Sequence, residues 1–292
     1  MSIDAQKLLA APPAEVPFAY TARDTMAHGL AIGLGMDPLD TKQLDFVYED
    51  GPGLQVFPTL STVLGWVDLL RDPLFADPAW GVDANEMVVG QLVFQAHKPL
   101  PVAGQGIARS YFAEVVDRGP GKAALLRVRK DLVFTDQGLM ATLDTWLYVR
   151  GAGGFGGPTG DGPERVILPE RAADRVCDLP TPANLALLFR LSLGDHNALH
   201  ADPDYAKRVG FERPILHGIA NFSIGVHGAL REMLDYDPSR ITGGQARMSG
   251  PVFPGDTLRT EMWRDDNALL FRTVAVERDT LVMDGGRLEL VG

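Results

Sequence analysis

The chain has 292 residues, of which 46% are hydrophobic and 22% are charged, and its formal net charge is −11 at pH 7. This composition is typical of a globular protein with a sizeable core, and the length fits one large domain or two smaller ones. The negative charge argues against non-specific binding to nucleic acid, which needs clustered Lys and Arg, although a local basic patch could still bind an anionic ligand.

The terminal sequences and the hydropathy predict a cytoplasmic protein. The first residues lack a basic stretch followed by an apolar run, so we expect no signal peptide. No window approaches 18 consecutive apolar residues, so we expect neither a transmembrane helix nor a membrane partner. The C-terminus carries no peroxisomal or retention tripeptide. The single cysteine, Cys177, cannot form an intramolecular disulfide, and its acidic neighbours predict a structural role.

The first half of the chain is predicted to hold one helix followed by several strands. Apolar residues at helical spacing predict a helix over Thr59–Leu70. A turn rich in Pro and Gly follows at Pro99–Gly104. Alternation of apolar and polar residues then predicts strands over 123–128, 131–134 and 142–149.

Residues 151–163, which read Gly-Ala-Gly-Gly-Phe-Gly-Gly-Pro-Thr-Gly-Asp-Gly-Pro, mark a junction. A stretch this rich in glycine and proline favours neither a helix nor a central strand. A phosphate-binding loop would need a helix start directly after it, and no helix signal follows. We therefore predict a first unit over residues 1–150, a linker over 151–164 and a second unit over 165–292.

The second half repeats the order of elements of the first. A longer and more apolar helix is predicted over Ile215–Leu234, and its glycines imply close packing, because each costs about 1 kcal/mol relative to alanine. A second Pro/Gly turn follows at Pro251–Gly255, before strands predicted over 257–264 and 269–276. A helix followed by antiparallel strands, used twice, predicts an α+β protein with two similar halves.

The run Gly194–Pro203 concentrates polar side chains that can carry out chemistry. It places Asp195, Asn197 and His200 within six residues, on a loop opened by glycine and closed by a proline that favours a new helix. An Asp and a His held near one another can exchange protons at neutral pH, which general acid–base catalysis requires. In the alternative interpretation, Asp195 only caps a short helix and His200 is an ordinary loop histidine.

Two residues after this run add to the candidate site. Gly218 begins the second predicted helix, where backbone N–H groups lack internal partners and could stabilise a developing oxyanion. The alternative is a glycine required only by packing. His217 either supports the site or caps the helix. His196 and His200 are four residues apart, which on a helix would suit a metal, but the flanking residues predict a loop, and we expect no metal.

The run resembles the motif of the (R)-specific enoyl-CoA hydratases, the MaoC-like dehydratase family, which reads roughly Gly-Asp-x-Asn-Pro-Leu-His-x-Asp-Pro. Further stretches resemble elements of the family's longer, two-repeat members: Tyr20–Asp24, Phe46–Glu49, Arg150–Gly157, Pro214–Gly218 and Pro251–Asp256. The resemblance implies the double hot-dog fold, in which a curved antiparallel sheet wraps a helix in each half. The chain departs from the motif by an extra residue, Leu193, and by Ala198 in place of proline, which loosens the loop. Either a bulge before the loop absorbs the extra residue, or Asp195 is displaced.

The resemblance implies reversible hydration of a trans-2-enoyl-CoA to an (R)-3-hydroxyacyl-CoA, in fatty-acyl or related acyl-CoA metabolism, without a redox cofactor or metal. Asp195 and His200 would be the catalytic pair. We favour His200 as the base that activates water and Asp195 as the acid that protonates C2, although the two could exchange roles. Asn197 would orient the water or the acid, unless it only serves the loop conformation, and Gly218 would supply the oxyanion donor.

The substrate and its partners are predicted from the same resemblance. Coenzyme A, present only as part of the substrate, would be held by Lys207, Arg208 and Arg247, with His217 beside them. The first half lacks the catalytic pattern, so we expect it to shape a tunnel for the acyl chain. By analogy we expect a homodimer.

Two alternatives remain open within the fold. In one, the substrate is a bulky enoyl-CoA with a branched, dicarboxylic or steroid side-chain acyl group. In the other, the protein is a non-catalytic subunit that binds acyl-CoA, against which the intact Asp195, Asn197 and His200 argue. A hot-dog thioesterase fits less well, because the spacing of carboxylate and histidine matches hydration better.

Overall fold

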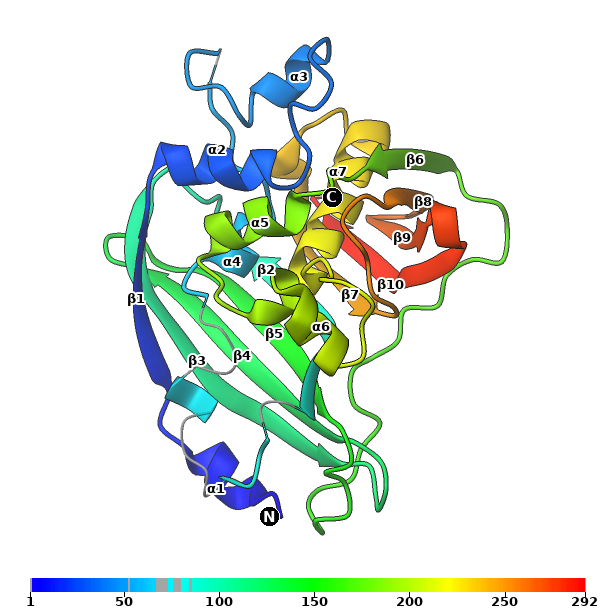
Figure 1. The fold of residues 1–292 in the computed structure, drawn as a ribbon. Coiled ribbons are helices and arrows are strands. Elements are labelled where there is room, and N and C mark those ends of the chain that lie inside the picture. Colours follow the sequence, from blue (N-terminus) through cyan, green and yellow to red (C-terminus); the bar gives the residue numbers. More distant parts are fainter. Residues whose placement is uncertain (1, 52, 67–72, 76–79, 84–85, 292) are drawn as a thin grey trace.

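A single antiparallel sheet dominates the computed structural model, which describes residues 2–51, 53–66, 73–75, 80–83 and 86–291. Within these residues ten strands pair in the order β1-β3-β4-β5-β2-β7-β10-β9-β8-β6 (Figure 1). The strands are β1 (Ala14–Tyr20), β2 (Met87–Ala96), β3 (Gly104–Asp117), β4 (Ala124–Phe134), β5 (Gly138–Val149), β6 (Arg175–Pro180), β7 (Ile241–Met248), β8 (Thr257–Asp265), β9 (Ala268–Ala275) and β10 (Thr280–Leu290). The strands predicted from alternation are confirmed, and the two predicted over 123–134 are one continuous strand.

The strand order repeats between the two halves. The first five strands are arranged as β1-β3-β4-β5-β2, and the last five follow the same order as β6-β8-β9-β10-β7. The halves meet where β2 pairs with β7, in a register that sets Gln91 opposite Arg247. The side chain of Gln91 also donates a hydrogen bond to Gln245, at 3.0 Å. The weak repeat in the sequence is therefore confirmed as a repeat of topology.

The longest helix lies at the centre of the second half, with the sheet bent around it (Figure 1). The helices are α1 (Ala5–Ala10), α2 (Ala22–Leu30), α3 (Thr41–Leu44), α4 (Leu60–Val63), α5 (Leu185–Leu193), α6 (Pro203–Arg208) and α7 (Gly218–Met233). Every residue of α7 from Ile219 to Leu230 is buried. The predicted close packing of its glycines is confirmed, because a Cβ atom on Gly225 would lie 2.7 Å from Met283 Cε. This is the double hot-dog arrangement expected from the resemblance.

Both predicted helices are shorter than expected. The helix predicted over Thr59–Leu70 is only α4, Leu60–Val63, and positions 67–70 lie outside the described residues. It ends there because Leu64 is extended (φ −64°, ψ 134°). Gly65 follows in a left-handed conformation (φ 60°) and packs so closely that a Cβ atom would lie 2.4 Å from Ala108 Cβ. The helix predicted over Ile215–Leu234 begins at Gly218, since His217 is extended (φ −61°, ψ 138°).

The Gly/Pro-rich segment is tied to the end of β3 by one carboxylate. Asp117 accepts hydrogen bonds from the backbone N–H groups of Gly154, Gly119 and Gly156, at 2.6, 2.8 and 2.8 Å. These bonds hold the pKa of Asp117 below its usual value. The segment thus has a fixed path although it forms no helix or strand.

One hydrophobic core runs through both halves. It joins Phe57 of the first half to Phe189, Phe222 and Phe271 of the second, all at most 1% exposed. Cys177 is buried in β6, where burial raises the pKa of its thiol to about 11, in keeping with a structural role. Among the described residues, no helix combines the length and the apolar character needed to cross a membrane.

Candidate active site

The end of α5 delivers Asp195 into the interior. Gly194 follows the helix in a left-handed conformation (φ 73°), and the N–H groups of Gly194 and Asp195 both bond to the carbonyl oxygen of Arg190, the latter at 3.0 Å. Leu193 is the last residue of the helix, so the extra residue lies within the last turn of α5 and not in a bulge before the loop. A glycine that ends a helix in this way absorbs the extra residue without a distortion in the loop.

The loop then turns so that His200 points back toward Asp195. The Asp195 carboxylate accepts from the N–H of Asn197 at 3.1 Å, and the Asn197 carboxamide oxygen accepts from the N–H of Leu199 at 3.0 Å. This cap begins the 3₁₀ turn Ala198–His200, and α6 follows at Pro203 as predicted. Asn197 (φ −63°) is therefore no left-handed residue, and its carboxamide oxygen shapes the loop that carries His200.

A hydrogen bond fixes the tautomer of His200. Its Nδ1 lies 2.8 Å from the carbonyl oxygen of Ile215, which can only accept, so Nδ1 carries the proton. Nε2 of the neutral ring is then unprotonated and can accept a proton. Burial lowers the pKa of His200 to about 3, so the ring is neutral at pH 7.

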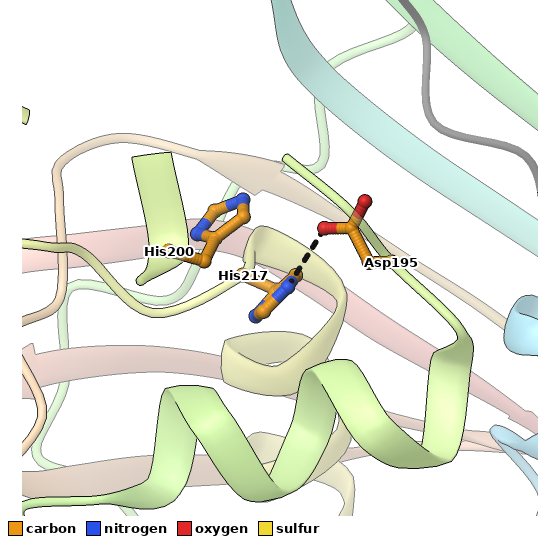
Figure 2. A group of neighbouring side chains, drawn as sticks. All are labelled: Asp195, His200 and His217. Atoms are coloured by element: carbon orange, nitrogen blue, oxygen red, sulfur yellow. Dashed lines mark hydrogen bonds and ion pairs between the residues drawn. The ribbon is translucent and has the colours of Figure 1, made fainter. Parts of the chain in front are cut away.

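His217 belongs to the site and does not cap α7 through its side chain. Its Nε2 donates to Oδ2 of Asp195 at 2.9 Å, and both side chains are at most 4% exposed. Its ring stacks on that of His200, with centroids 3.6 Å apart (Figure 2). Nδ1 of His217 is buried and has no hydrogen-bond partner within the described part of the chain. From the sequence, His217 could either support the site or cap the helix. Its side chain makes no capping hydrogen bond, so the second alternative does not apply.

These contacts set the charge of the site. Burial on its own would raise the pKa of Asp195, but the hydrogen bonds from His217 and the Asn197 N–H bring that pKa to about 2. Burial lowers the pKa of His217 as well as that of His200. At neutral pH the site therefore holds one carboxylate and two neutral imidazoles.

Within the described part of the chain, the same three side chains also form a group that could hold a metal ion. Asp195, His200 and His217 each offer one donor atom, and these atoms lie within 4.8 Å of one another. The bond between Asp195 and His217 already uses one atom of each, so a metal would have to replace its proton. His196, which the sequence set four residues from His200, is exposed and lies outside this group.

Gly218 is the first residue of α7, where helix geometry leaves its N–H without an intrahelical partner. A Cβ atom at this position would lie 3.3 Å from Sδ of Met248. The packing requirement is therefore real. It does not conflict with the role of oxyanion donor, which stays a prediction.

The predicted coenzyme A residues fall into two groups. Lys207 and Arg208 are exposed on α6, one turn after the catalytic loop. Arg247 lies in β7 and is ion-paired with Asp284 at 2.6 Å, so its charge is already matched within the sheet.

Sequence reasoning missed Arg190, in the last turn of α5. Its buried Nε has no hydrogen-bond partner among the residues that the structure describes, and its charge lowers the pKa of both His200 and His217. The signal was present, since Arg190 opens the Arg-Leu-Ser-Leu-Gly-Asp stretch that ends at Asp195.

Comparison with known proteins places this geometry in a family. Residues 166–285 match the family model described as the MaoC like domain, and residues 18–151 match the MFE-2 hydratase 2 N-terminal domain. The chain is 34% identical over 291 residues to enoyl-CoA hydratase ChsH3 of Mycobacterium tuberculosis, covering 100% of this chain and 99% of that protein. It is also 34% identical over 290 residues to 3-hydroxyacyl-thioester dehydratase Y of the same organism, covering 94% of each.

Solved structures agree. The crystal structure of a MaoC-like dehydratase from Phytophthora capsici superposes with a TM-score of 0.87 at 28% identity, covering 99% of this chain and 98% of that one. A Mycobacterium tuberculosis protein described as a double hotdog fold shares the fold alone, with a TM-score of 0.56 at 15% identity over 96% of each chain. The chain belongs to the MaoC-like dehydratase family, in the two-repeat form that carries an MFE-2 hydratase 2 N-terminal domain.

Proposed function

We propose that the protein is a hydro-lyase that reversibly adds water to a trans-2-enoyl-CoA and forms an (R)-3-hydroxyacyl-CoA. The observation that carries the proposal is the unprotonated ring nitrogen of His200 beside the ionised Asp195. A carboxylate oxygen of Asp195 and a ring nitrogen of His200 lie within 4.8 Å of each other, a gap that one water molecule can bridge by donating a hydrogen bond to each side chain. The names of the relatives, an enoyl-CoA hydratase and a 3-hydroxyacyl-thioester dehydratase, support the same reaction.

One water molecule supplies both groups that are added. As the water oxygen bonds to C3, its proton passes to Nε2 of His200, and the C2–C3 π electrons move toward the thioester oxygen. The resulting enolate takes the proton back at C2, which completes the addition. Because the pKa of Asp195 is about 2, it has no proton to give at neutral pH, and we now assign it to hold the water and to balance the imidazolium.

The enolate oxygen needs a donor that is already in place. The N–H of Gly218 lies at the N-terminus of α7, where the helix dipole favours negative charge. A backbone donor in a buried site needs no reorganisation as charge develops. We therefore propose this N–H as the oxyanion donor, which leaves the chain without need of a cofactor beyond the coenzyme A of its substrate.

For the coenzyme A phosphates we retain Lys207 and Arg208, which are exposed next to the catalytic loop. Arg247 would first have to leave Asp284, so it contributes least. Among the described residues of the first half, no helix is as long as α7, and α4 has only four residues, which supports the use of this half as the acyl-chain tunnel. A cytoplasmic homodimer remains a prediction, and light scattering of the purified protein would test the dimer.

The test follows the enoyl-thioester absorbance with purified protein and short and medium 2-enoyl-CoA substrates. We expect wild type to form the (R)-3-hydroxy product and both Asp195→Asn and His200→Gln to lose at least about 100-fold in kcat. His196→Gln, an exposed neighbour in the same loop, is the matched control and should keep its activity.

Three outcomes separate the alternatives. Binding without turnover across a wide acyl-CoA panel would favour the non-catalytic subunit. Release of free coenzyme A thiol would identify a thioesterase. Turnover confined to branched, dicarboxylic or steroid side-chain acyl groups would establish the bulky-substrate alternative.

A further inference from the structure

A small cavity lies in the first half, beside the start of α7. Its volume is about 60 Å³, enough for about two water-sized groups. Ile219, the residue after the proposed oxyanion donor, forms part of its wall. The cavity is therefore adjacent to the element that holds the reacting thioester, and its size suits a terminal group rather than a whole acyl chain.

The sheet presents polar side chains to this cavity on an otherwise apolar face. Ser110 of β3, Lys130 of β4 and Thr145 of β5 line it, together with leucines and valines. Ser110 and Lys130 are directly opposite each other in the β3–β4 register. Neighbouring strands thus place hydroxyl and ammonium groups side by side. An ordinary hydrophobic core would have only apolar side chains at these positions.

Trp66, which also lines the cavity, carries an indole N–H that can donate a hydrogen bond. Nε1 of Trp66 is buried and has no hydrogen-bond partner in the described residues. Buried donors without a partner are rare in native structures and commonly mark a place that a ligand or water completes. The two residues before Trp66 are held in place by the sheet. Nζ of Lys130 donates to the carbonyl oxygen of Leu64 at 2.8 Å, and Gly65 packs against Ala108.

All of these groups can donate a hydrogen bond, and Trp66 and Lys130 can only donate. We propose that the cavity binds the remote end of the acyl chain, and that this end carries an oxygen that accepts hydrogen bonds. A carbonyl, hydroxyl or carboxylate oxygen shares this chemistry, whereas a methyl end would leave the Trp66 donor unpaired. This inference deepens the proposed hydration and rests on it.

The experiment compares 2-enoyl-CoA substrates of equal length that end in a methyl, hydroxyl, keto or carboxylate group. We expect wild type to prefer at least one oxygen-bearing chain by about 10-fold in kcat/KM, since a site built to bond an oxygen discriminates against a chain without one. The preferred chain identifies which oxygen is bound. Trp66→Phe should remove that preference, with a larger loss of kcat/KM for the oxygen-bearing chain than for the methyl chain.

Trp146→Phe is the matched control, because Trp146 lies between Thr145 and Leu147 and so faces the other side of β5. It should keep the preference. If Trp66→Phe does not fold, Ser110→Ala carries the same test. Turnover without any preference, or an equal loss on all chains in Trp66→Phe, would overturn this inference alone. No turnover of any chain by wild type would refute the proposed function and this inference with it.

Discussion

The hydrogen bond from Nε2 of His217 is the contact that most lowers the pKa of the proposed catalytic carboxylate, Asp195. In Gln the side-chain amide nitrogen lies near the position of the histidine Nε2, whereas in Asn it lies near Nδ1. His217→Gln should therefore keep the donor to Asp195, and His217→Asn should lose it. Without the donor, burial dominates and the pKa of Asp195 rises from about 2.

The sign of the pH effect follows from this rise. A carboxylate with a raised pKa takes up a proton at higher pH, so the acidic limb of kcat/KM should move to higher pH in His217→Asn. We also expect kcat/KM to fall by about 10- to 100-fold at neutral pH, with most of the activity retained in His217→Gln. Full pH–rate profiles measure both effects. Profiles of the Asn and Gln variants that coincide would exclude this positioning role.

At the scale of elements, two glycines of α7 offer a matched pair of substitutions. A Cβ atom on Gly225 would lie 2.9 Å from the Phe271 ring, which cannot move easily, whereas on Gly228 it would lie 3.3 Å from Thr260 Cβ. Alanine gains about 1 kcal/mol of helix propensity at either site. Overpacking should outweigh this gain only at Gly225, so Gly225→Ala should lose about 1–2 kcal/mol of unfolding free energy.

Gly228→Ala should stay within about 1 kcal/mol of wild type, because a shift of a few tenths of an ångström relieves its contact. Urea unfolding of both variants measures the difference. The packing argument fails if Gly225→Ala is as stable as Gly228→Ala.

The same elements show how far the sequence could lead. Alternation predicted β4, β5, β8 and β9, and helical spacing with three glycines predicted a tightly packed α7, because both patterns are local records of burial. The end of α4 was missed, because no local pattern marks the extended Leu64 or the packing of Gly65 against Ala108, more than 40 positions away. The partner of Asp195 was missed for the same reason. Spacing favoured His200, whereas the bond to His217 is set by how α7 meets the loop.

For the whole molecule, two buried histidines lie where the halves meet. His28 of α2 bonds Thr59 Oγ1 at 3.1 Å, and its ring lies 6.0 Å from that of Phe189 in the second half. His227 of α7 bonds the carbonyl oxygen of Ile32 in the first half at 3.3 Å. Burial lowers the pKa of His28 to about 3 and that of His227 to about 4.

The unfolded chain, in which a histidine has a pKa near 6.5, therefore binds more protons than the folded one between about pH 4 and 6.5. The free energy of unfolding should fall as the pH drops through this window, by about 2 kcal/mol per histidine between pH 7.5 and 5. Urea unfolding at several pH values measures the slope.

Replacing both His28 and His227 by Gln should lower stability at pH 7.5 and should reduce the loss on acidification by about 4 kcal/mol. His97→Gln, an exposed site, should leave the slope unchanged. If the free energy of unfolding falls equally steeply with pH in wild type and in the double variant, acid destabilises the protein through groups other than these two histidines.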